Sequence, residues 1–128
     1  MAKRLLLVDD DPMMLSVLRR ILSTMARDAN VSVDSIQSGD DALTQIGKDQ
    51  GDTWFVVTDY EMPGMNGVQL LRNIREECPF ADVTSVIRSS RSKSEIDSWR
   101  TECIAVLSKI DESHTARLVD LFRCFCER

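Results

Sequence analysis

Residues 5–12 read LLLVDDDP and predict the first two elements of the fold. Their four consecutive apolar residues have the length and composition of a strand that is buried on both faces. Asp11 and Pro12 follow, and an acidic N-cap with proline at the first helical position is typical of a helix start. Apolar residues then recur at helical spacing as far as Met25. We therefore expect a buried strand followed at once by a helix.

The same alternation of strand and helix recurs along the chain. Further strand-like apolar runs lie at 31–36, 54–57, 83–87 and 104–107, and helical spacing of apolar residues follows at 42–46, 70–74, 96–103 and 118–125. Five such repeats predict an α/β fold, in which a five-stranded parallel sheet carries helices on both faces. The periodicity alone leaves the order of the strands open.

Length and composition predict one globular domain over residues 1–128. Hydrophobic residues make up 43% and charged residues 29%, which are ordinary values for a packed domain. The net charge of -5 and the sequence pI of about 4.8 disfavour direct binding to nucleic acid. Because no apolar run is long enough for a membrane span or a secretion signal, we expect a cytoplasmic protein without membrane contact.

The four cysteines are expected to be free thiols, as is usual in a reducing compartment. Cys124 and Cys126 are separated by one residue, which is not a zinc-binding spacing, and the single histidine, His114, lies well before them. We interpret these cysteines as small apolar residues.

Polar side chains directly follow four of the predicted strands. They are two aspartates, a third aspartate, two serines and a lysine, namely Asp9, Asp10, Asp59, Ser89, Ser90 and Lys109. The carboxyl ends of parallel strands lie along one edge of the sheet, and ligands bind in the crevice there. We therefore expect three carboxylates, one or two hydroxyls and one ammonium group to converge at this edge.

Each of these groups has a chemical task in phosphoryl transfer. Three neighbouring carboxylates repel one another, so they take up protons or bind a cation, and oxygen ligands favour Mg²⁺. One carboxylate can then act as a nucleophile and form an acyl phosphate, while Mg²⁺ neutralises charge. Lys109 and Ser89 can contact the phosphoryl oxygens. For Asp11 we prefer a structural role as a helix cap.

Residues 56–67, VVTDYEMPGMNG, resemble the phosphoacceptor signature of response-regulator receiver domains. That signature is an aspartate, two variable residues, Met-Pro, three more residues and a glycine. Residues 5–11 resemble the first strand and acidic pair of the family, 39–43 its second-helix signature, and 107–109 its lysine motif. The resemblance spans the whole chain and implies a flavodoxin-like (βα)5 fold with strand order 2-1-3-4-5, like that of the chemotaxis regulators.

The resemblance also implies a role for each site residue. Asp59 would be the phosphorylated residue, and it would hold Mg²⁺ together with Asp9, Asp10 and the backbone carbonyl of Glu61. Ser89 would be the switch hydroxyl and Lys109 the phosphate-binding lysine, so that the domain signals and is not an enzyme. An aspartate-dependent phosphatase would use Asp9 and Asp11, but it would leave Asp59 without a role.

The partners that the resemblance implies are those of two-component signalling. A histidine kinase or a histidine phosphotransfer protein would donate the phosphoryl group, and an unknown downstream protein would read it. The last two helices and the fifth strand would form the output surface and a possible homodimer interface. Trp99 would either anchor that surface or pack in the core.

Three positions depart from the family pattern. Ile110 stands in place of a proline, Val106 in place of an aromatic residue, and Ser90 in place of an alanine or glycine. Ser90 leaves the choice of switch hydroxyl open, although the distance from Asp59 along the chain favours Ser89. The missing proline and aromatic residue motivate an alternative function, a receiver-like interaction module that is not phosphorylated.

Two charged residues flank the predicted phosphorylation site. Glu61 lies two residues after Asp59, and Arg91 lies two residues after Ser89. We hypothesise that Glu61 and Arg91 form an ion pair that shields the acyl phosphate from water. The alternative is two independent, solvated charges, since exposed ion pairs contribute little.

Overall fold

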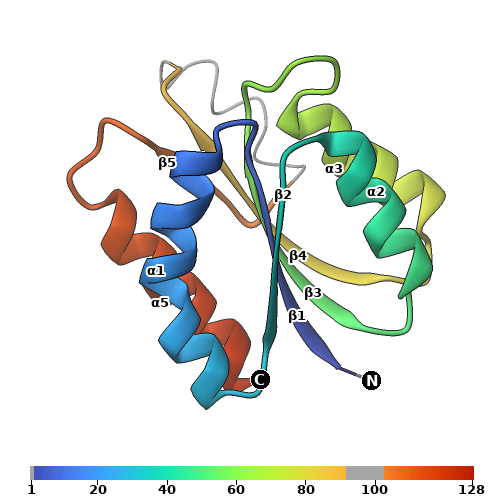
Figure 1. The fold of residues 1–128 in the computed structure, drawn as a ribbon, viewed down its shortest axis with the longest axis horizontal. Helices are drawn as coiled ribbons and strands as arrows, with labels where there is room; N and C mark the ends of the chain where they lie inside the picture. The colour runs from blue at the N-terminus through green and yellow to red at the C-terminus, as the bar shows by residue number, and fades with distance from the viewer. Residues whose placement is uncertain (1, 92–102) are drawn as a thin grey trace.

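One parallel sheet forms the centre of the protein (Figure 1). The computed structural model describes residues 2–91 and 103–128. The strands are β1 (Lys3–Val8), β2 (Ser32–Ile36), β3 (Thr53–Asp59), β4 (Asp82–Ser89) and β5 (Ala105–Ser108). All neighbouring strands are parallel and lie in the order β2-β1-β3-β4-β5. The strand order that the family resemblance implies is therefore confirmed.

Helices cover both faces of this sheet. The helices among the described residues are α1 (Pro12–Asp28), α2 (Gly39–Lys48), α3 (Gly67–Glu77) and α5 (His114–Glu127). Figure 1 shows α1 and α5 on one face, with α2 and α3 on the other. The predicted fourth helix, with Ile96 and Trp99, lies outside the described residues. Both roles considered for Trp99, as a surface anchor or as a core residue, therefore stay predictions.

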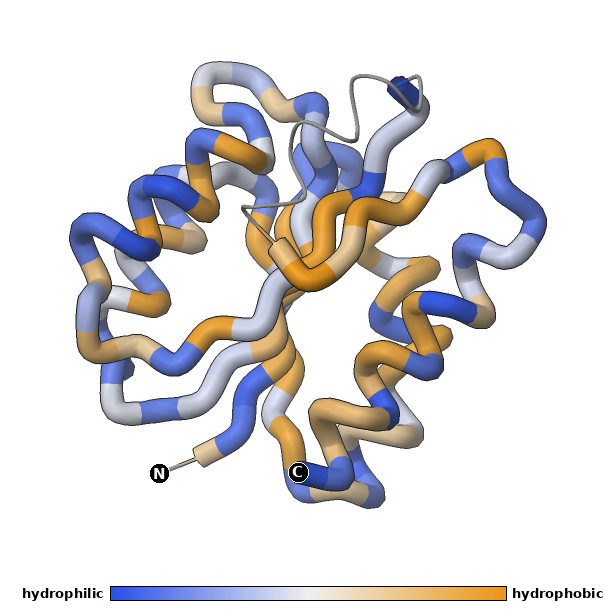
Figure 2. The backbone as a smooth tube through the Cα atoms, turned by 180° about the vertical axis from the view of Figure 1, so that it is seen from behind, coloured by the Kyte–Doolittle hydropathy of each residue, from blue (hydrophilic) through white to orange (hydrophobic). Residues whose placement is uncertain are grey.

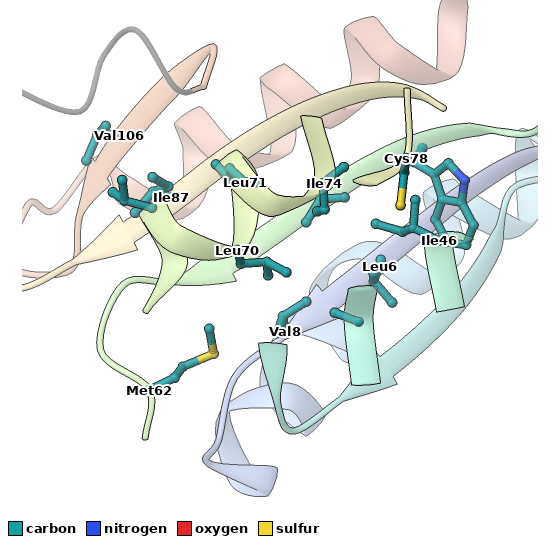
Figure 3. Packing of buried hydrophobic residues seen from close by; sticks show 14 residues of the cluster. Leu6, Val8, Ile46, Met62, Leu70, Leu71, Ile74, Cys78, Ile87 and Val106 are labelled. Atoms are coloured by element: carbon teal, nitrogen blue, oxygen red, sulfur yellow. The ribbon is translucent and has the colours of Figure 1, made fainter. Parts of the chain in front are cut away.

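The helices pack on the sheet through two separate hydrophobic clusters. Because strand side chains alternate between faces, Leu5 and Leu7 pack toward α1 and α5, whereas Leu6 and Val8 pack toward α2 and α3. Figure 3 shows the second cluster, and Figure 2 shows hydrophobic residues concentrated along the central strands. Strands buried on both faces require continuous apolar runs, which explains the uninterrupted sequence 5–8.

Aromatic packing joins β3 to α5. The ring of Phe55 lies 5.3 Å from the rings of both Phe122 and Phe125, measured between centroids. All three side chains are almost completely buried. The ammonium group of Lys3 donates hydrogen bonds to the carbonyl oxygens of Phe125 and Cys126, at 2.9 and 3.3 Å. These contacts fix the carboxyl end of α5 beside the start of β1.

Helix α1 begins where the sequence predicts. Asp11 accepts a hydrogen bond from the Met13 amide at 3.0 Å and Pro12 starts α1, so the predicted cap is confirmed.

The predicted fifth strand is shifted by one residue, because Ile104 is 56% exposed and lies before β5. All four cysteines are free thiols, as expected. No helix in the described ranges combines the length and apolar character that crossing a membrane requires.

Candidate functional site

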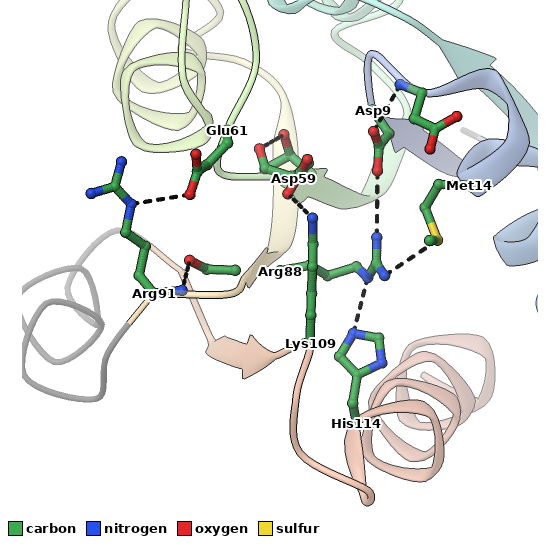
Figure 4. A network of polar contacts seen from close by, with 11 residues as sticks. Asp9, Met14, Asp59, Glu61, Arg88, Arg91, Lys109 and His114 are labelled. Atoms are coloured by element: carbon green, nitrogen blue, oxygen red, sulfur yellow. Dashed lines mark hydrogen bonds and ion pairs between the residues drawn. The ribbon is translucent and has the colours of Figure 1, made fainter.

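The strand alternation carries charged residues to one end of the sheet. The face that holds Leu5 and Leu7 continues to Asp9, one residue beyond β1. The same period of two leads from Val57 to Asp59, from Val86 to Arg88 and from Leu107 to Lys109. These four side chains therefore share the α1/α5 face at the carboxyl edge, and Figure 4 shows them meeting there.

The three predicted acidic residues come together at this edge. One carboxylate oxygen from each of Asp9, Asp10 and Asp59 lies within 4.8 Å of the other two. Asp9 is 2% exposed and Asp59 is 5% exposed, whereas Asp10 faces solvent. The structure thus forms a half-open acidic cluster from two separate strand ends, as the sequence predicts.

Lys109 pairs directly with Asp59. Its ammonium nitrogen lies 2.6 Å from Oδ1 of Asp59. This contact is an ion pair, and no other group of the described residues donates a hydrogen bond to the buried Oδ1. A buried carboxylate oxygen that has only an ion pair remains available to bind a further cation.

The acidic cluster fits a hard divalent cation. Its donor atoms are all oxygens, one of its carboxylates faces solvent, and within the described residues Oδ1 of Asp59 has only the Lys109 ion pair. Oxygen ligands with access for water suit Mg²⁺ better than they suit zinc or copper. Asp9, Asp10 and Asp59 would hold the ion. The backbone carbonyl of Glu61 stays a predicted ligand.

Burial raises the pKa of Asp9 above its ordinary value. The amide of Asp11 donates a hydrogen bond to Oδ1 of Asp9 at 2.9 Å and opposes this rise, while the negative charge of Asp59 adds to it. The charges of Lys109 and Arg88 act in the opposite direction. Two buried carboxylates and two cations therefore balance each other at the site, and a divalent cation would add to the stabilisation of the ionised carboxylates.

The two serines after the fourth strand occupy different environments. Ser89 is completely buried at the end of β4, and its hydroxyl accepts a hydrogen bond from the Arg91 amide at 3.0 Å. Its carbonyl oxygen accepts a hydrogen bond from the Lys109 amide at 2.8 Å, which holds the ends of β4 and β5 together. Ser90 is exposed. Burial and this direct link to Lys109 favour Ser89 as the switch hydroxyl, which stays a prediction.

Glu61 and Arg91 form the ion pair that the sequence suggests. The Nε atom of Arg91 lies 3.1 Å from Oε1 of Glu61, and both side chains are about half exposed. The guanidinium of Arg91 also lies 5.4 Å from the centre of the Tyr60 ring. The pair therefore lies next to the loop that follows Asp59, whereas its effect on an acyl phosphate stays a prediction.

Glycine at position 67 allows the loop after Asp59 to close. The amide of Gly67 donates a hydrogen bond to the Tyr60 carbonyl at 2.9 Å. A Cβ atom at this position would lie 2.6 Å from the backbone oxygen of Asp59, closer than real Cβ atoms approach. Asn66 and Gln69 then form a capping box that starts α3. The loop and the helix start together position the backbone of Asp59.

Sequence reasoning missed a buried arginine beside the acidic cluster. Arg88 is 4% exposed, and its Nε donates a hydrogen bond to Nε2 of His114 at 2.9 Å (Figure 4). Its Nη1 atom lies 3.5 Å from Oδ2 of Asp9, and its Nη2 atom lies 3.4 Å from the sulfur of Met14. The detectable signal was a charged residue on the inward face of an apolar strand.

The pKa of His114 is lowered to about 4. Burial is the main cause, and the positive charges of Arg88 and Lys109 add to it. At neutral pH the ring is therefore uncharged. Because Nε2 accepts the hydrogen bond from Arg88, the ring proton is on Nδ1.

The departures from the family pattern have structural counterparts. Val106 is 9% exposed and packs in the cluster on the α2/α3 face, where Figure 3 shows it near Ile87. Ile110 is 81% exposed in the connection between β5 and α5. The side chain at position 106 is therefore a buried aliphatic group in the core cluster.

Comparisons with known proteins agree with this geometry. The sequence profile of the response regulator receiver domain matches residues 5–116. The chemotaxis protein CheY-3 of Vibrio cholerae serotype O1 is 37% identical over 93 residues, which cover 72% of this chain and 67% of that protein.

Solved structures share the fold at lower sequence identity. A CheY-like receiver domain protein from Methanospirillum hungatei superposes with a TM-score of 0.72 at 22% identity, over 98% of this chain and 97% of its own. The response regulator TrrA from Thermotoga maritima, solved in complex with Mg(2+)-BeF, gives a TM-score of 0.70 at 22% identity, over 94% and 98%. At these identities the structural similarity establishes the fold alone. The profile match over residues 5–116, with which the acidic cluster and the Lys109 ion pair agree, shows that this chain belongs to the response-regulator receiver domain family of two-component signalling.

Proposed function

We propose that this domain accepts a phosphoryl group on Asp59 in a Mg²⁺-dependent reaction and thereby switches the binding of a partner. The observation that carries the proposal is the convergence of Asp9, Asp10, Asp59 and Lys109 at one edge of the sheet. The similarity to TrrA, which was solved with Mg(2+)-BeF, supports the choice of metal.

The donor would be the phosphohistidine of a histidine kinase or of a histidine phosphotransfer protein. A carboxylate oxygen of Asp59 attacks phosphorus, the P–O bond of an acyl phosphate forms, and the P–N bond to the donor histidine breaks. The leaving imidazole takes up a proton. A bound Mg²⁺ supplies positive charge against the phosphoryl oxygens.

Residues of this chain would orient the group and read it. Lys109 exchanges its contact with Oδ1 of Asp59 for a contact with the added phosphoryl group, and so retains a negatively charged partner. Ser89, whose hydroxyl now accepts from Arg91, turns to donate to the phosphoryl oxygens. These two contacts bias a two-state equilibrium, and a downstream protein binds one state better.

The setting of this reaction is proposed from the family. The domain works in the cytoplasm, and β5 and α5 contribute to its output surface and to a possible homodimer interface. The domain is labelled once per molecule and does not turn over a substrate as an enzyme does.

Intact mass after incubation with acetyl phosphate and Mg²⁺ tests the proposal. We expect a gain of one phosphoryl group, which disappears in Asp59→Asn and in an EDTA sample. Asp120→Asn on the surface of α5 is the matched control and should label normally. If the folded protein gains no mass, the proposal is wrong and a non-phosphorylated interaction module becomes the better interpretation. Steady hydrolysis of a phosphate ester, without stoichiometric labelling, would instead indicate an enzyme.

A further inference from the structure

The guanidinium of Arg88 lies at the acidic cluster, where a metal ion would also bind. Its Nη1 atom is 3.5 Å from Oδ2 of Asp9, and both side chains are at least 95% buried. The charge of Arg88 also acts on Asp59. A buried cation therefore already neutralises part of the charge that would attract a metal.

Both oxygens of Asp9 have partners within the protein. Oδ1 accepts the hydrogen bond from the Asp11 amide at 2.9 Å, and Oδ2 faces Arg88. A metal bound to Oδ2 must therefore displace Arg88 or share that oxygen with it. At 3.5 Å the contact is longer than a strong charge-assisted hydrogen bond, so a divalent cation can displace the guanidinium.

Two other elements fix the direction of the guanidinium. Nε donates to His114 at the start of α5, and Nη2 contacts the sulfur of Met14 on α1. Because the guanidinium is planar, a movement of Nη1 away from Asp9 also tilts Nε relative to the His114 ring. The acidic cluster and the start of α5 are therefore connected through one rigid group.

We infer that Arg88 is a positioning residue that competes with Mg²⁺ for Asp9, so that it weakens metal binding and transmits metal occupancy to His114 at the start of α5. This inference rests on the metal site of the proposed function. It adds a residue that sets the metal affinity and a physical connection from the metal to a helix of the proposed output surface.

Titration calorimetry with MgCl₂, without any phosphoryl donor, tests the competition. We expect the Kd for Mg²⁺ to fall at least about fivefold in Arg88→Met, because the competing charge is gone. Arg123→Met is the matched control, since it removes one positive charge from the distant part of α5 and should bind Mg²⁺ as the native chain does. Equal affinity in the native chain and a folded Arg88→Met would overturn the inference.

Nitrogen NMR of the imidazole ring tests the connection in the unmodified protein. His114 is the single histidine of the chain, so its ring signals need no assignment. We expect Mg²⁺ to shift the Nε2 resonance with the same midpoint as the calorimetric Kd, whereas NaCl of equal ionic strength does not. A ring signal that stays unchanged up to saturation would contradict the inference, even if Arg88→Met failed to fold.

The two experiments separate this inference from the proposed function. If Arg88→Met binds Mg²⁺ more tightly but acetyl phosphate does not label the native chain, the proposed function is wrong and the inference about Arg88 stands. If the native chain is labelled normally but the Kd for Mg²⁺ is the same in Arg88→Met, the proposed function stands and the inference about Arg88 is wrong.

Discussion

The ammonium nitrogen of Lys109 lies 2.6 Å from Oδ1 of Asp59, and both side chains share one face of the sheet. In this position Lys109 can hold the carboxylate before phosphorylation and the phosphoryl group after it. The contact joins the last residue of β3 to the residue directly after β5, and these two strands are not neighbours, since β4 lies between them.

Replacement of Lys109 by methionine is expected to slow phosphorylation strongly. Loss of one cation that stabilises the transferring group costs roughly 100-fold in rate, by analogy with the removal of an oxyanion-stabilising donor. The labelling rate with acetyl phosphate, measured by intact mass, checks this expectation. Lys48→Met, on α2, is the charge-matched control, and equal rates in the two variants would refute a role for Lys109.

Loss of the Glu61–Arg91 ion pair is expected to shorten the lifetime of the acyl phosphate. The pair lies beside the loop that follows Asp59, where it can restrict the approach of water. Glu61→Ala and Arg91→Ala should each accelerate dephosphorylation, and the double variant should be no faster than the faster single one. Half-lives come from the decay of the phosphorylated mass. An unchanged half-life in Glu61→Ala would exclude the shield, while stability should change by less than about 1 kcal/mol in each case.

Acid is expected to destabilise the fold through His114. The folded-state pKa of about 4 is below the ordinary value of 6.5, so the unfolded chain binds more protons between these two pH values. The contribution is fully present above pH 6.5 and falls as the pH falls, by about 2 kcal/mol at pH 5. Urea unfolding at pH 7.5 and pH 5 measures this loss.

His114→Gln is the control for that titration, because glutamine can accept the hydrogen bond from Arg88 without ionising. The opposite contribution of Asp9, whose pKa is raised, is common to both proteins and cancels in the comparison. An equal loss of stability in both proteins would show that His114 does not titrate as described.

An alanine at position 67 is expected to displace the loop that holds Asp59. Its Cβ atom would lie 2.6 Å from the Asp59 backbone oxygen, and relief of such overpacking typically costs about 1–3 kcal/mol. Gly51→Ala is the matched control, because a Cβ atom there meets nothing within 4 Å. We expect Gly67→Ala, but not Gly51→Ala, to lower both the free energy of unfolding, measured by chemical denaturation, and the rate of labelling by acetyl phosphate.

Replacement of Lys3 by methionine is expected to loosen the end of α5. The ammonium group satisfies terminal carbonyls of this helix and lies 5.4 Å from the Phe125 ring centre. We expect a loss of about 1 kcal/mol, the usual size of a charged helix cap. Urea unfolding measures it, and Arg20→Met on the exposed side of α1 should leave stability nearly unchanged.

Most of the fold followed from the sequence, because strands buried on both faces leave continuous apolar runs. The uninterrupted run at residues 5–8 and the cap at Asp11 identified β1 and α1 correctly. The strand order came from the family resemblance, since periodicity contains no information about which strands are neighbours. The start of β5 was misplaced because Ile104 is apolar yet exposed, and an apolar run does not show which of its members face solvent.

The acidic cluster was also predictable from the sequence, whereas the buried Arg88–His114 pair beside it was not. Asp9 and Lys109 directly follow strands and Asp59 ends one, and the geometry of a parallel sheet brings strand ends together. The Arg88–His114 contact joins residues 26 positions apart, from a strand and the start of a helix. Neither residue belongs to a motif, and only the packed structure shows that they meet.

The strand alternation described above also determines which kinds of genetic change the site can survive. Deletion of one residue within β3 would keep its apolar character, but it would rotate every later side chain to the opposite layer. Asp59 would then face away from Lys109 while the strand itself still formed. Substitutions in the helices can accumulate gradually, but a change of a single codon in strand length would remove the site in one step.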